Sequence, residues 1–170
     1  DAFVDGGGTM IDTADVYSAW APGNSGGESE ATIGRWLARD PAKRGQVVIA
    51  TKVGFMSGLA PETVAAACDA SLQRLGVDCI DLYYQHKDDE SVPLGDSLKT
   101  FDDQAKAGKI RAIGLSNFTP GRLAEACIIA RVDGFPAVSA FQTWYNLLER
   151  PQYEAALREV AVKEGLAVFP

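Results

Sequence analysis

Six short apolar runs, repeated at intervals of about thirty residues, constrain the fold of this chain more than any other feature. They begin at residues 9, 47, 79, 110, 137 and 166, so the intervals between them range from 27 to 38 residues. Parallel strands joined by crossover helices need about 30 residues for each β-α unit. Most of the runs are apolar at successive positions, which is typical of strands covered on both faces. The spacing therefore predicts an α/β protein built from six βα repeats.

Amphipathic patterns fill the intervals between the runs and predict a helix in each. The predicted helices cover residues 28–39, 61–75, 94–107, 120–131 and 151–164. Pro61 suits a first helical turn, and Gly76 is placed to end that helix. Residues 1–5 resemble the last turn of a further helix, which Gly6-Gly7-Gly8 would stop. Residues 18–27 are rich in Gly, Ser, Asn and Pro and predict a loop.

Two architectures accommodate six βα repeats: a doubly wound sheet and a portion of a (β/α)8 barrel. Doubly wound dinucleotide folds usually carry G-x-G-x-x-G after the first strand, whereas here Asp15-Val16-Tyr17 follows the first run. The even repeat and the missing glycine motif favour the (β/α)8 TIM barrel, of which the chain would hold about six of the eight units. No linker or low-complexity stretch divides the chain, so we expect residues 1–170 to form a single barrel domain, truncated at both ends.

The composition argues against several classes of protein. Of the 170 residues, 46% are hydrophobic and 23% charged, which is typical of a globular domain and not of a disordered chain. No apolar run approaches the ~20 residues of a membrane span, so no membrane partner is expected. A net charge of −7 argues against nucleic-acid binding. Three cysteines without a C-x-x-C pair favour free thiols, a cytoplasmic location and no metal site.

Polar residues capable of chemistry follow five successive apolar runs, at the point where each predicted strand ends. They are Asp12 with Tyr17 beyond it, Lys52, His86, Ser116 with Asn117, and Gln142. Each alone has a structural explanation, as a capping aspartate, a surface lysine, a core histidine or a helix N-cap. In both candidate architectures, however, active sites form beyond the carboxyl ends of the strands. Together these residues therefore predict one site.

This set of side chains suits the reduction of a carbonyl group. A lysine ammonium beside a phenol favours the phenolate, and a carboxylate such as Asp12 would hold that ammonium in place. Tyr17 could then protonate an oxyanion, while a neutral His86 donates to the same oxygen. Ser, Asn and Gln side chains can hold a planar carboxamide such as that of nicotinamide. The hydride would come from a nicotinamide cofactor, because no protein side chain supplies one.

The order of these residues resembles that of the aldo-keto reductases, in particular their bacterial and fungal aryl-alcohol-dehydrogenase-like branch. Five segments, which together cover nearly the whole chain, carry the resemblance. They are Asp12-Thr13-Ala14-Asp15-Val16-Tyr17 followed by Gly27-Glu28-Ser29-Glu30, then Ala50-Thr51-Lys52, then Asp81-Leu82-Tyr83-Tyr84-Gln85-His86, then residues 108–118, and then Phe141-Gln142-Thr143-Trp144-Tyr145-Asn146. They are similar to the family's D-x-A-x-x-Y, lysine-strand, D-L-Y-x-x-H, G-K-x-R-x-x-G-x-S-N-F and Q-x-x-Y-N motifs, in the same order.

The resemblance implies a (β/α)8 barrel that reduces aldehydes or ketones with NADPH, or with NADH as the alternative. Carried over by position, Tyr17 is the general acid, Asp12 and Lys52 tune it, and His86 orients the carbonyl. The residues that would hold the nicotinamide carboxamide are Ser116, Asn117 and Gln142. Trp20, in the predicted loop, would border the pocket for a small-molecule carbonyl substrate.

Members of that family also carry strands ahead of the segment that matches Asp1 and beyond the one that matches Pro170. We therefore expect the 170 residues alone to bind NADPH poorly and to reduce little. Two other functions remain open: a Schiff-base lyase with Lys52 as the nucleophile, and a non-catalytic or redox-sensing subunit with a reductase-like barrel. The oligomeric state is not predicted.

Overall fold

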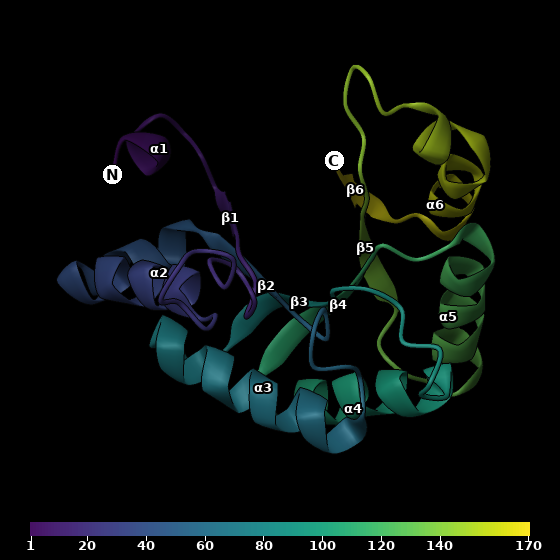
Figure 1. The fold of residues 1–170 in the computed structure, drawn as a ribbon, viewed down its shortest axis with the longest axis horizontal. Helices are drawn as coiled ribbons and strands as arrows, with labels where there is room; N and C mark the ends of the chain where they lie inside the picture. Colours follow the sequence, from purple (N-terminus) through teal and green to yellow (C-terminus); the bar gives the residue numbers. More distant parts are fainter.

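The strands form one parallel sheet whose spatial order is the order of the sequence. The computed structural model describes all 170 residues. Its strands are β1 (Met10–Asp12), β2 (Val48–Val53), β3 (Ile80–Gln85), β4 (Ile110–Ser116), β5 (Val138–Gln142) and β6 (Ala167–Phe169). The order runs from β1 to β6, and every neighbouring pair is parallel. A doubly wound sheet would reverse its order at a switch point. This sheet has no reversal and curls in one direction as an incomplete (β/α)8 barrel, with β1 and β6 as its edges (Figure 1).

Helices alternate with the strands, so the prediction of six βα repeats is confirmed. They are α1 (Ala2–Asp5), α2 (Glu28–Arg39), α3 (Pro61–Leu75), α4 (Leu94–Lys106), α5 (Pro120–Val132) and α6 (Arg158–Glu164). The triple glycine does stop a helix: the Gly6 N–H bonds to the Ala2 carbonyl, and Gly7 has a φ of 90°. None of the helices combines the length and the apolar character that a membrane crossing requires.

Two details differ from the sequence expectations. A 3-10 helix, η1 (Pro41–Gln46), follows α2, with the Asp40 carboxylate accepting from the Ala42 N–H at 3.2 Å. The predicted helix over residues 151–164 is interrupted, because a π-helical turn, η2 (Tyr153–Leu157), precedes α6. Within that turn Ala155 leaves the helical conformation, with a ψ of −125°. Periodicity alone shows neither feature, because the apolar spacing of so short a segment does not distinguish 3-10, π-helical and α-helical turns.

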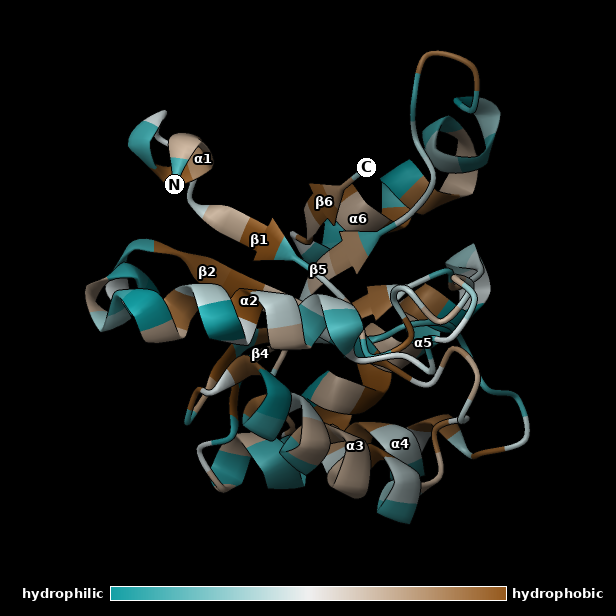
Figure 2. Cartoon of the chain, turned by 60° about the vertical axis from the view of Figure 1, so that its left-hand side comes forward, coloured by the Kyte–Doolittle hydropathy of each residue, from teal (hydrophilic) through white to brown (hydrophobic).

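Most of the core lies between the convex face of the sheet and the helices. One cluster packs α2, α3 and α4 against β2 and β3 and includes Ile49, Tyr83 and Phe101, each 0% exposed. A second cluster packs α5 and α6 against β4 and β5, around Leu115 and Phe141. Figure 2 shows this arrangement as hydrophobic strands beside helices that are hydrophilic on one side. Each large buried side chain contributes about 2–5 kcal/mol to stability relative to alanine.

The concave face of the sheet carries the site and has a smaller buried cluster than the convex face. Side chains alternate between the two faces of a strand, so every second residue of each strand lies on the inside. Ala50, Leu82, Tyr84 and Ala140 form the buried cluster there. Gly114 faces Tyr84 across β3 and β4, and a Cβ at Gly114 would lie 2.4 Å from the Tyr84 ring. The inner face can thus hold the Tyr84 ring only because its neighbour Gly114 has no side chain.

Candidate functional site

A cavity of about 600 Å³ lies at the carboxyl ends of the strands and brings together most of the residues predicted from sequence. Those among its lining residues are Asp12, Tyr17, His86, Ser116, Asn117 and Gln142. The ones that do not belong to the predicted set are Thr143, Trp144, Tyr145, Asn146 and Pro170. The structure therefore places residues from β1, β3, β4 and β5 around one space.

Lys52 lies beneath this cavity and is the centre of its hydrogen bonding. Its side chain is 0% exposed, so the surface-lysine explanation is wrong. The Nζ atom donates to Asp12 Oδ2 at 2.6 Å, to the Thr13 carbonyl at 2.8 Å and to the Tyr17 hydroxyl at 2.9 Å. All three protons of an ammonium group are thereby used. A buried charge needs such partners, and Asp12 supplies the opposite charge.

Tyr17 reaches Lys52 from the turn that follows β1. The start of this turn is bonded to β2, because the Asp15 N–H donates to the Lys52 carbonyl at 3.1 Å. It continues with the Tyr17 N–H donating to the Ala14 carbonyl at 3.2 Å. Lys52 Nζ also lies 4.5 Å from the centre of the Tyr17 ring. The phenol is held at the cavity wall with its hydroxyl directed at an ammonium group.

His86 follows β3 and is buried, with 7% of its surface exposed. Burial, together with the positive charges of Lys52 and Lys87, lowers the pKa of His86 to about 4. The imidazole is therefore neutral at physiological pH, with one N–H to donate. Its Nδ1 atom has no hydrogen-bond partner, and its ring centre lies 5.9 Å from that of Tyr17. His86 is therefore not a structural core histidine whose ring nitrogens are both satisfied by neighbouring groups.

Ser116 and Asn117 end β4, next to Gln142 at the end of β5. Asn117 has a φ of 56°, and its Nδ2 donates to the His86 carbonyl at 2.9 Å and to Ser116 Oγ at 3.1 Å. These two bonds use both protons of the side-chain amide and leave its oxygen, Asn117 Oδ1, as an acceptor. The Gln142 side chain makes no hydrogen bond within the protein, so its amide is available to a ligand. The N-cap of α5 is Thr119, so neither Ser116 nor Asn117 has that role.

A second, apolar cavity of about 430 Å³ adjoins Tyr17 and His86. Trp20 lines it, and its ring centre lies 6.0 Å from that of Tyr17. Phe55 and Met56, which follow β2, also line the cavity and were not predicted from the sequence. Trp20 and Met56 are 75% and 78% exposed, and apolar side chains grouped on a surface are typical of a binding site. Two adjacent apolar residues in a loop, three and four positions beyond Lys52, were the signal that could have identified them.

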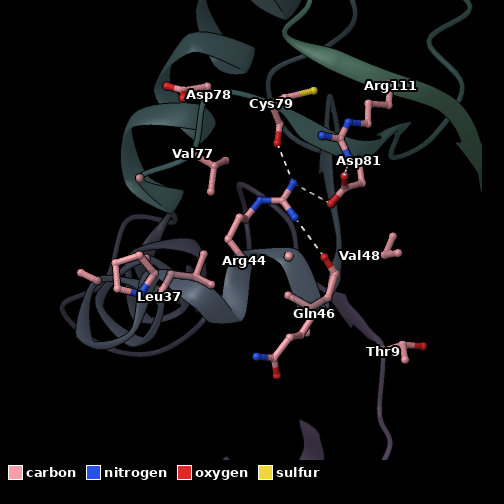
Figure 3. A pocket seen from close by; sticks show the side chains of 16 residues that line it. Thr9, Leu37, Arg44, Gln46, Val48, Val77, Asp78, Cys79, Asp81 and Arg111 are labelled. Carbon is pink, nitrogen blue, oxygen red and sulfur yellow. Dashed lines mark hydrogen bonds and ion pairs between the residues drawn. The ribbon is translucent and has the colours of Figure 1, made fainter.

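A third cavity, of about 610 Å³, lies at the opposite, amino ends of the strands (Figure 3). Its charged groups satisfy one another. Arg44 donates to the Cys79 carbonyl at 2.9 Å and pairs with Asp81 at 2.7 Å, and Arg111 pairs with the other oxygen of the same carboxylate at 2.7 Å. Asp81 also accepts from the Ile49 N–H, so this cluster ties β2, β3 and β4 together. In barrels this end contributes to stability, and we do not assign a function to it.

Comparisons with known proteins agree with the motif order. A sequence model of the Aldo/keto reductase family matches residues 1–170. "Uncharacterized oxidoreductase YrpG" of Bacillus subtilis is 34% identical over 88% of this chain and 48% of its own. "Aldo-keto reductase str7" of Strobilurus tenacellus is 34% identical over 99% of this chain and 47% of its own. "Aflatoxin B1 aldehyde reductase member 4" of Homo sapiens is 32% identical over 88% and 44%.

The chain thus spans about half the length of the curated relatives it matches. Several of those relatives are named as oxidoreductases or reductases. The parallel sheet, the residues at its carboxyl ends and the match along the whole sequence all lead to one conclusion. The chain belongs to the aldo/keto reductase family.

Proposed function

We propose that the protein reduces aldehydes or ketones to alcohols, with hydride from NADPH and a proton from Tyr17. One observation carries the proposal: buried Lys52 contacts both the Tyr17 hydroxyl and the Asp12 carboxylate, at 2.9 and 2.6 Å. An ammonium at this distance favours the anionic form that a phenol takes after giving up its proton. The phenol can therefore donate to an alkoxide as it forms, and Asp12 keeps the ammonium in place.

His86 has a different part in the proposed reaction. Because its imidazole is neutral, it can donate one hydrogen bond to the carbonyl oxygen without carrying a charge into the site. Its ring and that of Tyr17 border the same cavity, so a carbonyl oxygen between them would meet two donors. Fixing that oxygen also fixes the face of the carbonyl carbon that accepts hydride.

The residues at the ends of β4 and β5 fit a nicotinamide ring. The side-chain oxygen of Asn117, Oδ1, is free to accept, and the side-chain amide of Gln142 is free to donate and accept, as a planar carboxamide requires. We propose that they hold the carboxamide together with Ser116. When bound, the nicotinamide supplies hydride chemistry that side chains lack. NADPH is the proposed cofactor, with NADH as the alternative, and membership of the family supports a nicotinamide cofactor.

The apolar cavity supports a substrate with an aromatic or other apolar group next to its carbonyl. Phe55 lies with its ring centre 4.8 Å from that of His86, so an apolar group there would lie beside the proposed proton donors. A human relative carries the name of an aldehyde reductase, which agrees with this class of substrate. The three free cysteines agree with a reducing compartment, and we propose a cytoplasmic location.

The geometry disfavours a Schiff-base lyase. A nucleophilic lysine needs a free lone pair, whereas Lys52 donates all three of its protons to neighbouring oxygens. The direct test is NADPH consumption by the full-length protein, as made in its natural host, with a panel of aromatic aldehydes. We expect NADPH to be oxidised in step with alcohol formation, and no substrate to be trapped on Lys52 by borohydride. Trapping on Lys52, or tight NADPH binding without turnover on any aldehyde or ketone, would contradict the proposal.

A further inference from the structure

Glu30 is buried outside the cavity, yet it connects the elements that carry Tyr17 and Lys52. We infer that Glu30 is a positioning residue. Its bonds to Thr51 and Arg74 fix the start of α2, and the start of α2 in turn fixes the Tyr17 turn against Lys52. The inference rests on the proposed function, because it concerns the same tyrosine–lysine pair. Glu30 lies in the first turn of α2, the helix that follows the turn and the loop after β1, and it is 0% exposed.

The first connection runs from Glu30 to β2. Its Oε1 atom accepts from the Thr51 hydroxyl at 2.6 Å, and Thr51 is also 0% exposed. Thr51 directly precedes Lys52, so the two side chains leave β2 on opposite faces. Glu30 therefore holds the outer side of the same strand whose inner side presents the lysine. Its Oε2 atom accepts from Arg74 Nε of α3 at 2.7 Å, which gives the buried carboxylate an opposite charge.

The second connection runs from the start of α2 back to the Tyr17 turn. Ser29, next to Glu30, shares a hydrogen bond of 2.7 Å with the Thr13 hydroxyl. The Thr13 carbonyl in turn accepts from Lys52 Nζ at 2.8 Å. The chain before α2 also packs closely on the turn, since a Cβ at Gly26 would lie 2.8 Å from the Asp15 carbonyl oxygen. The start of α2 is thus fixed to β2 on one side and to the Tyr17 turn on the other.

The Tyr17 hydroxyl itself has a single hydrogen bond, to Lys52. Its distance from Lys52 therefore depends on how the turn is held. Replacing the Glu30 carboxylate by an amide would leave the Arg74 guanidinium without its anionic partner and set an amide N–H against one of the two donors. The start of α2 would shift, and a displacement of about 1 Å at a reacting group can lower a rate by as much as 100-fold.

The experiment compares Glu30→Gln with Glu62→Gln in the full-length protein. Glu62 is the matched control, because it also lies in the first turn of a helix, α3, but is exposed and makes no side-chain hydrogen bond. Fluorine NMR of protein labelled with fluorotyrosine reports the position of Tyr17 without needing turnover. Tyr17→Phe and Tyr153→Phe assign the two resonances that are compared. The rate of NADPH-dependent aldehyde reduction and the affinity for NADPH are measured on the same samples.

We expect Glu30→Gln to move the Tyr17 resonance, to leave that of Tyr153 near α6 in place and to lower kcat by about 10- to 100-fold. Affinity for NADPH should remain, since the residues proposed to hold the carboxamide lie on β4 and β5. An unmoved Tyr17 resonance, or an equal effect of Glu62→Gln, would overturn the inference. If Glu30→Gln unfolds and moves every tyrosine resonance, Thr51→Val replaces it in the comparison and must move that of Tyr17. Absence of turnover in the parent protein would contradict the proposed function, while the fluorine spectra would still decide on Glu30.

Discussion

At the scale of single residues, burial decides which protonation states the site can use. His86 and Asp15 illustrate this in opposite directions. Burial lowers the pKa of His86 to about 4, because the charged imidazolium loses its hydration and faces two lysines. Burial, and then the negative charge of Glu30, raises the pKa of Asp15 to about 6. One buried Asp15 carboxylate oxygen also lacks a hydrogen-bond partner.

These two shifts predict opposite effects of acid on stability. Between the ordinary pKa of 6.5 and the folded value of about 4, unfolded His86 binds a proton that folded His86 does not, so acidification destabilises the protein. Between about 6 and the ordinary 3.8, folded Asp15 binds the proton first, so acidification stabilises it. On going from about pH 7 to pH 5, His86→Gln should lose less unfolding free energy than the parent, and Asp15→Asn should lose more, by about 1 kcal/mol each.

Urea unfolding at the two pH values measures these differences, with the change in the parent as the reference. Other carboxylates titrate equally in parent and variants, so they cancel in the comparison. Parallel free-energy changes in all three proteins would contradict the assigned directions.

At the scale of elements, the contact between β3 and β4 depends on a missing side chain. Gly114 lies opposite Tyr84 in the register of the two strands, and a Cβ there would lie 2.4 Å from the Tyr84 ring. Tyr84 is 0% exposed, so its ring has little room to move away. We expect Gly114→Ala to lower the free energy of unfolding by about 1–3 kcal/mol through overpacking.

Gly121 provides the control for this substitution. It lies in the first turn of α5, and no atom would come within 4 Å of an added Cβ. Gly121→Ala should be neutral or should stabilise by up to about 1 kcal/mol, because alanine has the higher helix propensity. Urea unfolding curves compare the two variants. Equal effects at both positions would show that the loss of glycine flexibility, and not the contact with Tyr84, sets the cost.

The elements also show what the sequence could predict and what it could not. The strands and most helices follow from local patterns, because a continuous apolar run or a helical spacing of apolar residues can be recognised within one short segment. The strand-end residues follow from the same logic, because parallel strands deliver their carboxyl ends to one edge. The Glu30 connections do not, since Thr51 and Arg74 lie 21 and 44 residues away and any polar residue in α2 would give the same local pattern.

The missed loop residues and the π-helical turn have related causes. Phe55 and Met56 belong to no periodic pattern, and they gain their meaning only where the loop after β2 meets the Tyr17 turn. The π-helical turn depends on how the segment before α6 packs, and its sequence is compatible with an ordinary helix. Tertiary contacts, and not local preference, decide such features.

At the scale of the whole molecule, the curled sheet brings residues from four strands to one cavity and places Lys52 of a fifth strand beneath it. Asp12 and Lys52 come from β1 and β2, and His86 follows β3. The strand order and the curl place this donor group beside the free amide of Gln142 on β5. The proposed proton donors and the residues proposed to hold the carboxamide therefore lie on different strands, so we expect a substitution to affect one function and spare the other.

The central claim is that Tyr17 gives the proton in carbonyl reduction. The most direct measurement is the rate of aldehyde reduction by Tyr17→Phe in the full-length protein, alongside NADPH binding on the same sample. Tyr153→Phe is the control, because its hydroxyl makes no hydrogen bond within the protein. We predict that Tyr17→Phe lowers the rate by about 100-fold or more and binds NADPH as the parent does, while Tyr153→Phe keeps both. A Tyr17→Phe protein that reduces aldehydes at the parent rate would contradict the account.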